Sequence, residues 1–239
     1  MKRVLITGAT SGIGRELAIQ LVDKGYKVGL IGRRTDRLQE LKEQLGELVH
    51  FRTLDVRNTI EATKAYQELI EEMGGMDIMI LNAGVGRHKL LAAWESDEKT
   101  LEVNIMAFAH GCHFAFDYFN RQGHGQIVGM SSIASLVASA GSAAYTASKH
   151  FVSNYLTGFR QKARRVSADI TITEIKPGFV KSEMTENNSK MFWVSSTQKA
   201  VQQMVRAIEK KRNHVYVTKR WRLLAWVAKS IPQFVWDRL

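Results

Sequence analysis

Short apolar runs alternate with longer amphipathic segments along almost the whole chain. The runs are rich in β-branched residues, as buried strands of parallel sheets are, and they occupy residues 3–7, 27–31, 49–54, 77–81, 126–130, 170–175 and 215–217. Between them, apolar residues recur at helical spacing, which predicts helices at residues 12–24, 36–45, 60–73, 97–119, 143–165 and 197–211. Right-handed crossovers place such helices on both faces of a sheet. We therefore expect an α/β fold with a doubly wound parallel sheet of about seven strands.

One helix start carries a capping signal. Ser96, Asp97 and Glu98 precede the segment that contains Asn104, and a serine followed by acidic residues is typical of a helix N-terminus. We expect this helix to begin directly after Ser96.

The chain is expected to form one domain and a tail. Its 239 residues suffice for one large domain and are marginal for two, and only 2 prolines and no low-complexity tract argue against linkers. The domain should span residues 1–217 and the tail residues 218–239.

The tail has the pattern of an amphipathic helix followed by Phe234 and Trp236. Arg222 and Lys229 lie away from its apolar face. That face is formed by Leu224, Val227, Ala228 and Ile231. The helix is too short and too charged to span a bilayer. Two interpretations remain open: the helix packs against its own domain or a neighbouring subunit, or it lies in a membrane interface.

Composition and charge limit the class of protein. A hydrophobic content of 45% and a charged content of 24% are those of a soluble globular protein. The net charge of +11 would attract cofactor phosphates, acidic ligands, nucleic acid or anionic membranes. The basic groups at residues 160–165 and 206–212 are interpreted as solvated helix faces. No nucleic-acid-binding module is recognisable, so we expect no nucleic-acid partner.

Cysteine and histidine usage indicates neither a disulfide nor a metal. Cys112 is the sole cysteine, which excludes an intrachain disulfide and suits a reducing compartment. His110 and His113 flank it without a third ligand at useful spacing, so no metal is expected. The first apolar run is too short for a signal-peptide core. We expect a cytoplasmic protein, with membrane association of the tail as the alternative.

A glycine-rich turn follows the first strand directly and opens the first helix. Gly8 permits a tight exit from the strand, Gly12 lets the backbone approach an anion, and Gly14 packs the helix close to the sheet. Because helix N–H groups face that anion, the turn predicts a dinucleotide pyrophosphate site. Its spacing is GxxxGxG, which the usual GxGxxG search misses. The site is expected to comprise Gly8, Thr10, Ser11, Gly12, Ile13 and Gly14.

The end of the second strand indicates which dinucleotide binds. NAD-preferring enzymes place an acidic residue there to hold the ribose 2′-hydroxyl, whereas this chain has Arg33 and Arg34, with no carboxylate before Asp36. A guanidinium matches phosphate oxygens, so we expect NADP(H) to be preferred over NAD(H). Arg33 is the main candidate for the 2′-phosphate, with Arg15 or Arg34 as a second clamp.

Tyr145 and Lys149 lie four residues apart and therefore on one face of a helix. The Lys149 ammonium can stabilise the Tyr145 phenolate and bring the pKa of the phenol toward the working pH, as general acid–base catalysis requires. An apolar strand over residues 126–130 delivers Ser131 and Ser132 to the same region. The three groups predict a proton-transfer site, in which either serine hydroxyl can take part.

With these motifs, the chain resembles the short-chain dehydrogenase/reductase family, single-domain branch, over residues 1 to roughly 217. The resemblance implies a Rossmann fold and further cofactor contacts. The catalytic group that it implies is Asn104, Ser132, Tyr145 and Lys149, where Ser132 is preferred to Ser131 because its spacing from Tyr145 is that of the family. The cofactor contacts that it implies are Asp55, Val56, Asn82, Ala83, Gly84, Tyr145, Lys149, Pro177, Gly178, Val180 and Ser182.

The family mechanism assigns a role to each catalytic residue. Hydride passes between the nicotinamide and a substrate carbon, while Tyr145 transfers a proton to or from the oxygen that Ser132 orients. Lys149 holds the nicotinamide ribose and lowers the pKa of Tyr145, and Asn104 positions a water that links Lys149 to solvent. The resemblance thus implies an NADP(H)-dependent oxidoreductase for a ketone, aldehyde or secondary alcohol.

Two residues depart from the family pattern. Ser182 stands where threonine is usual, which retains a hydroxyl for the nicotinamide amide. Ser11 stands where many NADP-dependent members have a basic residue, so NADP preference depends on Arg33. The alternative function is a dinucleotide-binding regulatory or scaffold protein without turnover. The resemblance also implies a homodimer or homotetramer, formed through the helix with Tyr145 and the helix after Thr197.

The substrate pocket is expected to be partly apolar. Residues 183–196 are polar at first and then give Met191, Phe192 and Trp193, which suits a mobile lid with an apolar inner side. Packing of Met191 and Trp193 into the body of the domain is the alternative. Residues 85–91 and 135–142 should complete the pocket. We expect a small-molecule substrate of moderately apolar type.

Overall fold

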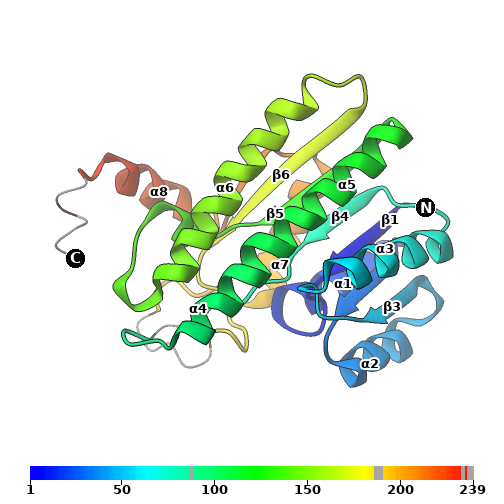
Figure 1. Ribbon diagram of the computed structural model, residues 1–239, viewed down its shortest axis with the longest axis horizontal. Coiled ribbons are helices and arrows are strands. Elements are labelled where there is room, and N and C mark those ends of the chain that lie inside the picture. Colours follow the sequence, from blue (N-terminus) through cyan, green and yellow to red (C-terminus); the bar gives the residue numbers. More distant parts are fainter. Residues whose placement is uncertain (87–88, 186–190, 233–234, 236–239) are drawn as a thin grey trace.

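Seven parallel strands form one sheet in the computed structural model, which describes residues 1–86, 89–185, 191–232 and 235 (Figure 1). Their order is β3-β2-β1-β4-β5-β6-β7, and every neighbouring pair is parallel. The strands are β1 (Arg3–Thr7), β2 (Lys27–Gly32), β3 (Val49–Thr53), β4 (Ile78–Leu81), β5 (His124–Met130), β6 (Asp169–Pro177) and β7 (His214–Val217). The predicted doubly wound sheet is confirmed.

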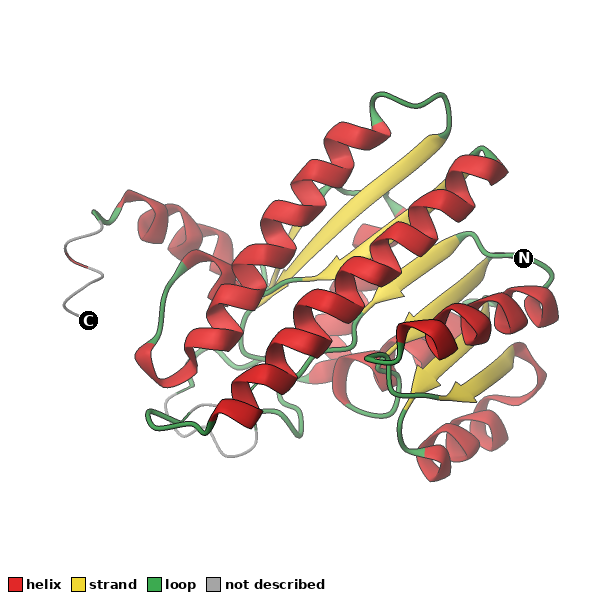
Figure 2. Cartoon of the chain, viewed as in Figure 1, coloured by secondary structure: helices red, strands yellow, loops and turns green. Residues whose placement is uncertain are grey.

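Helices cover both faces of this sheet (Figure 2). One apolar core lies under α1 (Gly12–Val22), α2 (Thr35–Leu45) and α7 (Thr197–Glu209). The other core lies under α3 (Thr59–Met73), α5 (Phe108–Gln122) and α6 (Ala143–Ala163). The remaining helical segments are η1 (Gly46–Leu48), α4 (Trp94–Leu101), η2 (Glu102–Ala107), η3 (Ile133–Leu136), η4 (Ala140–Ser142) and α8 (Trp221–Ser230).

The central strands are apolar without alternation because both of their faces are covered. In β1, Val4 and Ile6 belong to one core and Leu5 to the other, and all three are fully buried. Successive strand residues point to opposite faces, so a strand with helices on both sides needs apolar residues at every position. The parallel sheet predicted from the apolar runs follows from this burial.

The helix predicted over residues 97–119 consists of three joined pieces. α4 begins at Trp94 with Ala93 as its N-cap, so the prediction of a start after Ser96 was wrong. Ser96 lies within the first turn, and its carbonyl oxygen accepts a hydrogen bond from Thr100 Oγ1 at 2.8 Å. The middle piece, η2, is a π-helix and contains Asn104. π-Helical turns are often found at functional sites, because they redirect individual side chains.

The strand order places the site at one end of the sheet. From β1 the chain continues to β2 and β3 on one side, whereas β4, β5, β6 and β7 follow on the other. Open α/β sheets bind ligands outside the carboxyl ends of the strands at such a reversal. Within the described residues, no helix has the length and apolar character that crossing a membrane requires.

The tail helix α8 packs on the domain by one face only. Trp221 and Ala225 are buried, whereas Leu223, Trp226 and Val227 are exposed. The apolar face expected from the sequence was therefore only partly right, since it included Val227 and omitted Trp221. Phe234 and Trp236 lie outside the described residues. The domain boundary after residue 217 stays a prediction.

Candidate active site

A cleft of about 540 Å³ opens at the carboxyl ends of the strands. Three of the residues predicted from sequence do not line it: Asn104 and Gly14 lie directly behind its wall, and Arg15 points away from it. The predicted residues that do line it are Gly8, Thr10, Ser11, Gly12, Ile13, Arg33, Arg34, Asp55, Val56, Asn82, Ala83, Gly84, Ser132, Tyr145, Lys149, Pro177, Gly178, Val180 and Ser182.

The turn between β1 and α1 uses its glycines in three different ways. Gly8 has a φ of 72°, and a Cβ there would lie 2.7 Å from Ala83 Cα. Gly12 has a φ of 52° and faces Ser182 across the cleft. A Cβ on Gly14 would lie 2.1 Å from the Gly8 carbonyl oxygen, so only glycine allows the helix to pack this closely. The cradle thus leaves main-chain N–H groups accessible to a pyrophosphate.

Asn82 locks this turn to the end of β4. Its Nδ2 donates to the carbonyl oxygens of Thr7 at 3.2 Å and of Gly8 at 2.9 Å. In return, Thr7 Oγ1 accepts hydrogen bonds from the main-chain N–H groups of Asn82 and Ala83, both at 3.2 Å. The Asn-Ala-Gly segment therefore has a structural task at the floor of the cleft, because it holds the phosphate turn in shape.

Asp55 lies beside two arginines at the end of β3. Its Oδ2 is 3.7 Å from Arg33 Nη1 and 3.0 Å from Arg57 Nη2. Burial opposes ionisation of Asp55, but the hydrogen bonds from Arg57 outweigh it and hold the pKa of this carboxyl below its ordinary value. Asp55 is therefore ionised at neutral pH and orients Arg33 at the mouth of the cleft.

Arg34 forms a second basic position on the same side. Its Nε and Nη2 atoms donate to Thr10 Oγ1 at 3.2 and 3.1 Å, and its Nη1 lies 2.9 Å from Glu183 Oε2. Arg37, in the first turn of α2, also pairs with Glu183. Two guanidinium groups thus share one carboxylate from the segment after β6.

Arg15 does not reach the site. Its Nη2 lies 3.2 Å from Glu40 Oε1 and 3.0 Å from Gln44 Oε1, which are on α2. The sequence placed Arg15 next to the glycine turn, but its side chain is directed to the neighbouring helix, so its prediction as a phosphate clamp was wrong. Arg34 is the second arginine that lines the cleft.

Ser132 and Tyr145 form the polar pair at the centre of the cleft. Ser132 follows β5 in extended conformation, and its Oγ also accepts a hydrogen bond from Ala134 N at 3.1 Å. Burial raises the pKa of Tyr145, and a hydrogen bond with Ser132 acts in the opposite direction. Ser131 is directed elsewhere, since its Oγ donates to the Lys149 carbonyl oxygen at 3.3 Å. The geometry thus favours Ser132 as the partner of Tyr145.

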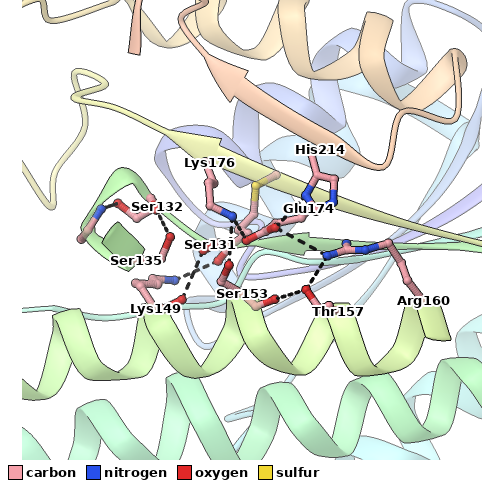
Figure 3. A network of polar contacts seen from close by, with 12 residues as sticks. Ser131, Ser132, Ser135, Lys149, Ser153, Thr157, Arg160, Glu174, Lys176 and His214 are labelled. Atoms are coloured by element: carbon pink, nitrogen blue, oxygen red, sulfur yellow. Dashed lines mark hydrogen bonds and ion pairs between the residues drawn. The ribbon is translucent and has the colours of Figure 1, made fainter. Parts of the chain in front are cut away.

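Lys149 lies behind Tyr145 and is almost fully buried. Its Nζ is 5.6 Å from the centre of the Tyr145 ring. The same nitrogen donates to the Met130 carbonyl oxygen at 2.9 Å (Lys149 in Figure 3). Burial lowers the pKa of the Lys149 ammonium to about 8. The expectation that Lys149 brings the pKa of Tyr145 below its ordinary value was wrong for this structure, because burial of the phenol dominates.

Asn104 holds the loop after β4 in place by hydrogen bonds. Its Oδ1 accepts a hydrogen bond from Val85 N at 2.9 Å, and its Nδ2 donates to Val85 O at 2.8 Å and to Ser148 Oγ at 3.0 Å. Its amide group is thus engaged with the main chain and with α6. The predicted role of Asn104 in positioning a water stays a prediction.

Pro177 and Gly178 end β6 beside the cleft. A Cβ on Gly178 would lie 1.9 Å from Trp221 Nε1, so this glycine allows α8 to pack against the site. Ser182 lies further along, and its main-chain N–H donates to Thr185 Oγ1 at 3.0 Å. Its hydroxyl is 3.3 Å from the same atom. Ser182 therefore presents a hydroxyl to the cleft from a fixed turn.

Sequence reasoning missed Arg37, which pairs with Glu183 beside the cleft. Arg37 lies one helical turn after Arg34, so its spacing was a usable signal. Glu183 and Thr185 belong to residues 183–196, for which a lid was predicted, and both line the cleft; the contact of Glu183 with the distant Arg34 leaves no local pattern in the sequence. Residues 87–88 and 186–190 of the predicted substrate loops lie outside the described residues. Phe192 and Trp193 contact Trp221 of the tail helix α8 and are about half-exposed, so both alternatives for this segment stay open.

A second polar cluster joins β6, β7 and α6, the helix that also carries Lys149 (Figure 3). Glu174 on β6 is 1% exposed; it pairs with Lys176, accepts a hydrogen bond from His214 Nδ1 at 3.1 Å and lies 3.8 Å from Arg160 Nη2. Lys176 Nζ also donates to Ser153 Oγ of α6 at 3.0 Å. Although burial opposes ionisation of Glu174, these partners lower its pKa to about 2.

No group of three or more His, Cys, Asp or Glu side chains in the described ranges is arranged to hold a metal ion. His110 Nε2 lies 3.0 Å from Thr63 Oγ1, and Cys112 is buried in the core, where burial raises the pKa of its thiol. The histidines and the cysteine that attracted attention in the sequence are thus engaged in packing.

Several proteins are similar in sequence to this one over most of its length. The family model described as short chain dehydrogenase matches residues 2–193. An uncharacterized oxidoreductase of Mycobacterium tuberculosis is 34% identical over 218 residues, which cover 88% of this chain and 85% of that protein. The 15-hydroxyprostaglandin dehydrogenase of Homo sapiens, whose name specifies NAD(+), is 31% identical over 197 residues, which cover 79% of this chain and 72% of that protein.

Solved structures share the fold. A short chain dehydrogenase/reductase from Burkholderia phymatum in complex with NAD has a TM-score of 0.85 and 21% identity, over 94% of this chain and 91% of that chain. The closed form of serine dehydrogenase complexed with NADP+ has a TM-score of 0.78 and 25% identity, over 90% and 94%. The protein therefore belongs to the short-chain dehydrogenase/reductase family and is an NAD(P)-dependent oxidoreductase acting on CH–OH groups.

Proposed function

We propose that this protein is an NADP(H)-dependent oxidoreductase that interconverts a moderately apolar ketone or aldehyde and the corresponding alcohol. The observation that carries the proposal is the convergence of Ser132, Tyr145 and Lys149 in the cleft that the glycine turn opens. A bound nicotinamide supplies or accepts the hydride. The chain itself supplies the proton path and the groups that hold the substrate oxygen.

Tyr145 transfers the proton in this proposal. Burial keeps its pKa above the ordinary value, so the phenol is protonated at neutral pH, as proton donation to a carbonyl oxygen requires. Ser132 hydrogen-bonds the same oxygen and orients it. Lys149, a buried cation whose pKa is about 8, stabilises negative charge on the phenol oxygen after transfer. Lys149 also binds the nicotinamide ribose hydroxyls, while Asn104 keeps the loop at residue 85 in place.

NADP(H) is preferred in this proposal because the adenosine side of the cleft is basic. Arg33 and Arg34 line it, and Arg37 stands beside them. Glu183 pairs closely with Arg34 and Arg37, whereas Asp55 lies 3.7 Å from Arg33 and is bound more closely by Arg57, so Arg33 carries most of the preference. A guanidinium–phosphate pair contributes about 1.5–3 kcal/mol, which corresponds to roughly tenfold to a hundredfold in relative affinity.

Substitution of Arg33 tests this preference. Arg33→Asp should lower the ratio of kcat/KM for NADPH to that for NADH by at least about tenfold. Arg15→Asp is the matched control, because Arg15 is paired with α2 and should leave the ratio unchanged. An unchanged ratio in Arg33→Asp would refute the assignment.

The substrate side of the cleft is partly apolar. Met184 lines the cleft and is 52% exposed, and Leu90 and Leu91 are exposed in the loop that follows β4. These residues suit a small molecule with an apolar body beside its carbonyl group. A panel of carbonyls and alcohols, followed by NADPH absorbance, tests the activity. Tyr145→Phe is the control; turnover equal to that of the unsubstituted protein would refute the role of Tyr145, and absence of turnover by both would favour a dinucleotide-binding protein without catalysis.

The assembly and the compartment belong to the same proposal. We place the enzyme in the cytoplasm, where the single buried thiol of Cys112 stays reduced. The family resemblance favours a homodimer or homotetramer through α6 and α7. On α6, Phe151 and Tyr155 stack at 4.8 Å and are only partly buried, which supports an interface on this helix. Sedimentation velocity tests it, since a monomeric mass at micromolar concentration would contradict this assembly.

A further inference from the structure

The outer face of α8 is apolar, although its opposite face already packs on the domain. Leu223 is 68% exposed, Trp226 72% and Val227 47%. A surface helix normally places polar residues on the side away from the core. Exposed apolar side chains gathered on one helix face mark a site of interaction, because isolated ones alone need no partner.

Trp221 anchors this helix on the body of the protein and is 3% exposed. Its ring lies 5.6 Å from that of Phe179, 5.1 Å from that of Phe192 and 5.7 Å from that of Trp193. It also packs against Gly178, which lines the cleft. The outer face of α8 is therefore presented in a defined orientation. Figure 1 shows α8 beyond the carboxyl ends of β5 and β6, on the side of the active site.

The exposed surface continues from α8 to the segment before α7. Arg220 Nη2 donates to the Trp193 carbonyl oxygen at 2.7 Å, and its guanidinium lies 5.2 Å from the centre of the Trp193 ring. Phe192 and Trp193 are themselves half-exposed. Aromatic rings beside cations are typical of surfaces that lie at the boundary between lipid and water.

The charge of this surface has one sign. Between residues 218 and 232 the sequence contains lysines and arginines but no aspartate or glutamate. Lys219 and Arg222 also line an open hollow of about 570 Å³. The rest of its lining is Tyr216, Leu223, Ala225 and Trp226. Cations around an aromatic hollow suit an anionic headgroup, with apolar side chains beside it for acyl chains.

We propose that α8 docks this protein on the surface of an anionic lipid membrane, with Leu223, Trp226 and Val227 inserted among the headgroups and Lys219 and Arg222 paired with lipid phosphates. The helix lies in the interface and does not cross the bilayer. Apolar insertion and electrostatic attraction act together in this kind of binding.

A second copy of the chain fits this face poorly. In a two-fold symmetric dimer the same patch lies on both subunits, so the cations of one α8 would approach those of the other. Juxtaposed like charges disfavour association, whereas an anionic lipid surface neutralises them. The positive charge of α8 thus favours binding to an anionic lipid surface over binding to a second copy of the chain.

Docking through α8 has a consequence for the substrate, which rests on the proposed function. Because Trp221 joins α8 to Gly178, the docked helix brings the carboxyl-end side of the sheet, with its cleft, toward the lipid surface. A carbonyl compound or alcohol that partitions into membranes would then reach the cleft without crossing bulk water. The substrate class is therefore a lipid-soluble ketone, aldehyde or alcohol.

Vesicle co-sedimentation of the full chain without nucleotide tests the docking independently of catalysis. The probes are phosphatidylcholine vesicles with and without phosphatidylglycerol. The first variant is Lys219→Glu/Arg222→Glu. Its control, Arg206→Glu/Lys210→Glu, changes the net charge by the same amount but at the end of α7 and the residue after it. The second pair is Trp226→Ser against Ile60→Ser, which removes an exposed apolar side chain from α8 or from α3.

We expect binding to the anionic vesicles only, weakened at least tenfold in the α8 variants and unchanged in the controls. Equal binding by variants and controls, equal binding to neutral vesicles, or no binding at all would overturn the proposal. A loss of oligomeric mass in the α8 variants, without a change in vesicle binding, would identify a protein interface instead. Turnover of a water-soluble carbonyl by these variants reports separately on the proposed function.

Discussion

Two lysines are buried between α6 and β6, and they differ in whether a carboxylate pairs with them. Lys149 projects from α6 and Lys176 from β6, and each is 6% exposed (Figure 3). Lys176 is paired with the buried carboxylate of Glu174, whereas Lys149 donates to the Met130 carbonyl oxygen. Among the described residues no carboxylate forms an ion pair with Lys149. Burial consequently lowers the pKa of Lys149 to about 8, while the pKa of Glu174 falls to about 2.

This difference assigns Lys176 to the stability of the fold and Lys149 to catalysis. A buried charge with a full set of opposite partners is stable as it stands, and its loss exposes those partners to an apolar interior. A buried cation without a carboxylate is held in a state that favours any new negative charge nearby. Strongly shifted groups in a cleft are accordingly candidates for catalysis, and the cleft position of Lys149 satisfies that condition.

The sharpest test of this comparison replaces each lysine by methionine, which has similar length and no charge. We expect Lys149→Met to lower kcat/KM by about 10²–10⁴-fold, because the phenolate of Tyr145 loses its stabilising cation. Its thermal stability should not fall, because the lost hydrogen bond to Met130 is offset by the removal of a cation that burial destabilises. Steady-state kinetics and calorimetry on the same preparation measure both effects.

Lys176→Met is the matched control for that experiment. The activity of its folded fraction should equal that of the unsubstituted enzyme, whereas its stability should fall. If Lys149→Met retained full activity, or if Lys176→Met alone abolished it without unfolding, the division of roles between the two lysines would be wrong.

The next largest effect is expected at Glu174. Glu174→Gln removes the charge that Lys176, His214 and Arg160 face, and breaking a buried pair in this way costs about 3–5 kcal/mol of unfolding free energy. Because the folded pKa of Glu174 is depressed, its contribution is present above its ordinary pKa and is lost as the pH falls toward about 2. Urea unfolding at pH 7 and at pH 3.5 should therefore give a smaller difference between the two proteins at the lower pH. A constant difference would contradict the ionised state of Glu174.

Lys149 should give a pH dependence of the same sign in a more alkaline window, because here it is the charged form that burial destabilises. Its folded pKa of about 8 lies below its ordinary value of 10.5, so between these values the unfolded chain binds more protons than the folded one. The unsubstituted protein should therefore gain stability relative to Lys149→Met as the pH rises from about 8 toward 10.5, with a limiting slope of about 1.4 kcal/mol per pH unit. Chemical denaturation at several pH values measures the slope. A flat or falling difference would show that Lys149 is not destabilised by burial.

The contrast between these two sites also explains which features could be predicted from the sequence and which could not. Strands were predictable because both faces of β1, β4 and β5 are buried, so apolar runs mark them directly. The glycine turn, Ser132, Tyr145 and Lys149 were predictable because their spacing along the chain is short and fixed by the elements that carry them. Each of those signals is local.

Features that depend on distant contacts could not be predicted in this way. The Glu174 cluster joins β6, α6 and β7, and nothing in the spacing of these residues indicates that a glutamate in an apolar strand has cationic partners. Arg15 shows the same limit in another way. It lies beside the glycine turn as expected, but its side chain is directed to α2 by contacts that its position in the sequence does not indicate. The start of α4 at Trp94 depends on the loop before it and not on the serine that resembled a cap.

The smallest expected effect distinguishes the two serines at the end of β5. Ser131 donates to the Lys149 carbonyl oxygen and is buried, so Ser131→Ala should cost about 1 kcal/mol of stability and leave kcat within about twofold. Ser132→Ala should instead lower kcat, because Ser132 faces Tyr145 in the cleft, and should cost about 1 kcal/mol of stability through the lost hydrogen bond from Ala134 N. Unfolding curves and initial rates of both variants decide the matter. Loss of rate in Ser131→Ala with full rate in Ser132→Ala would transfer the role of orienting the substrate oxygen to Ser131.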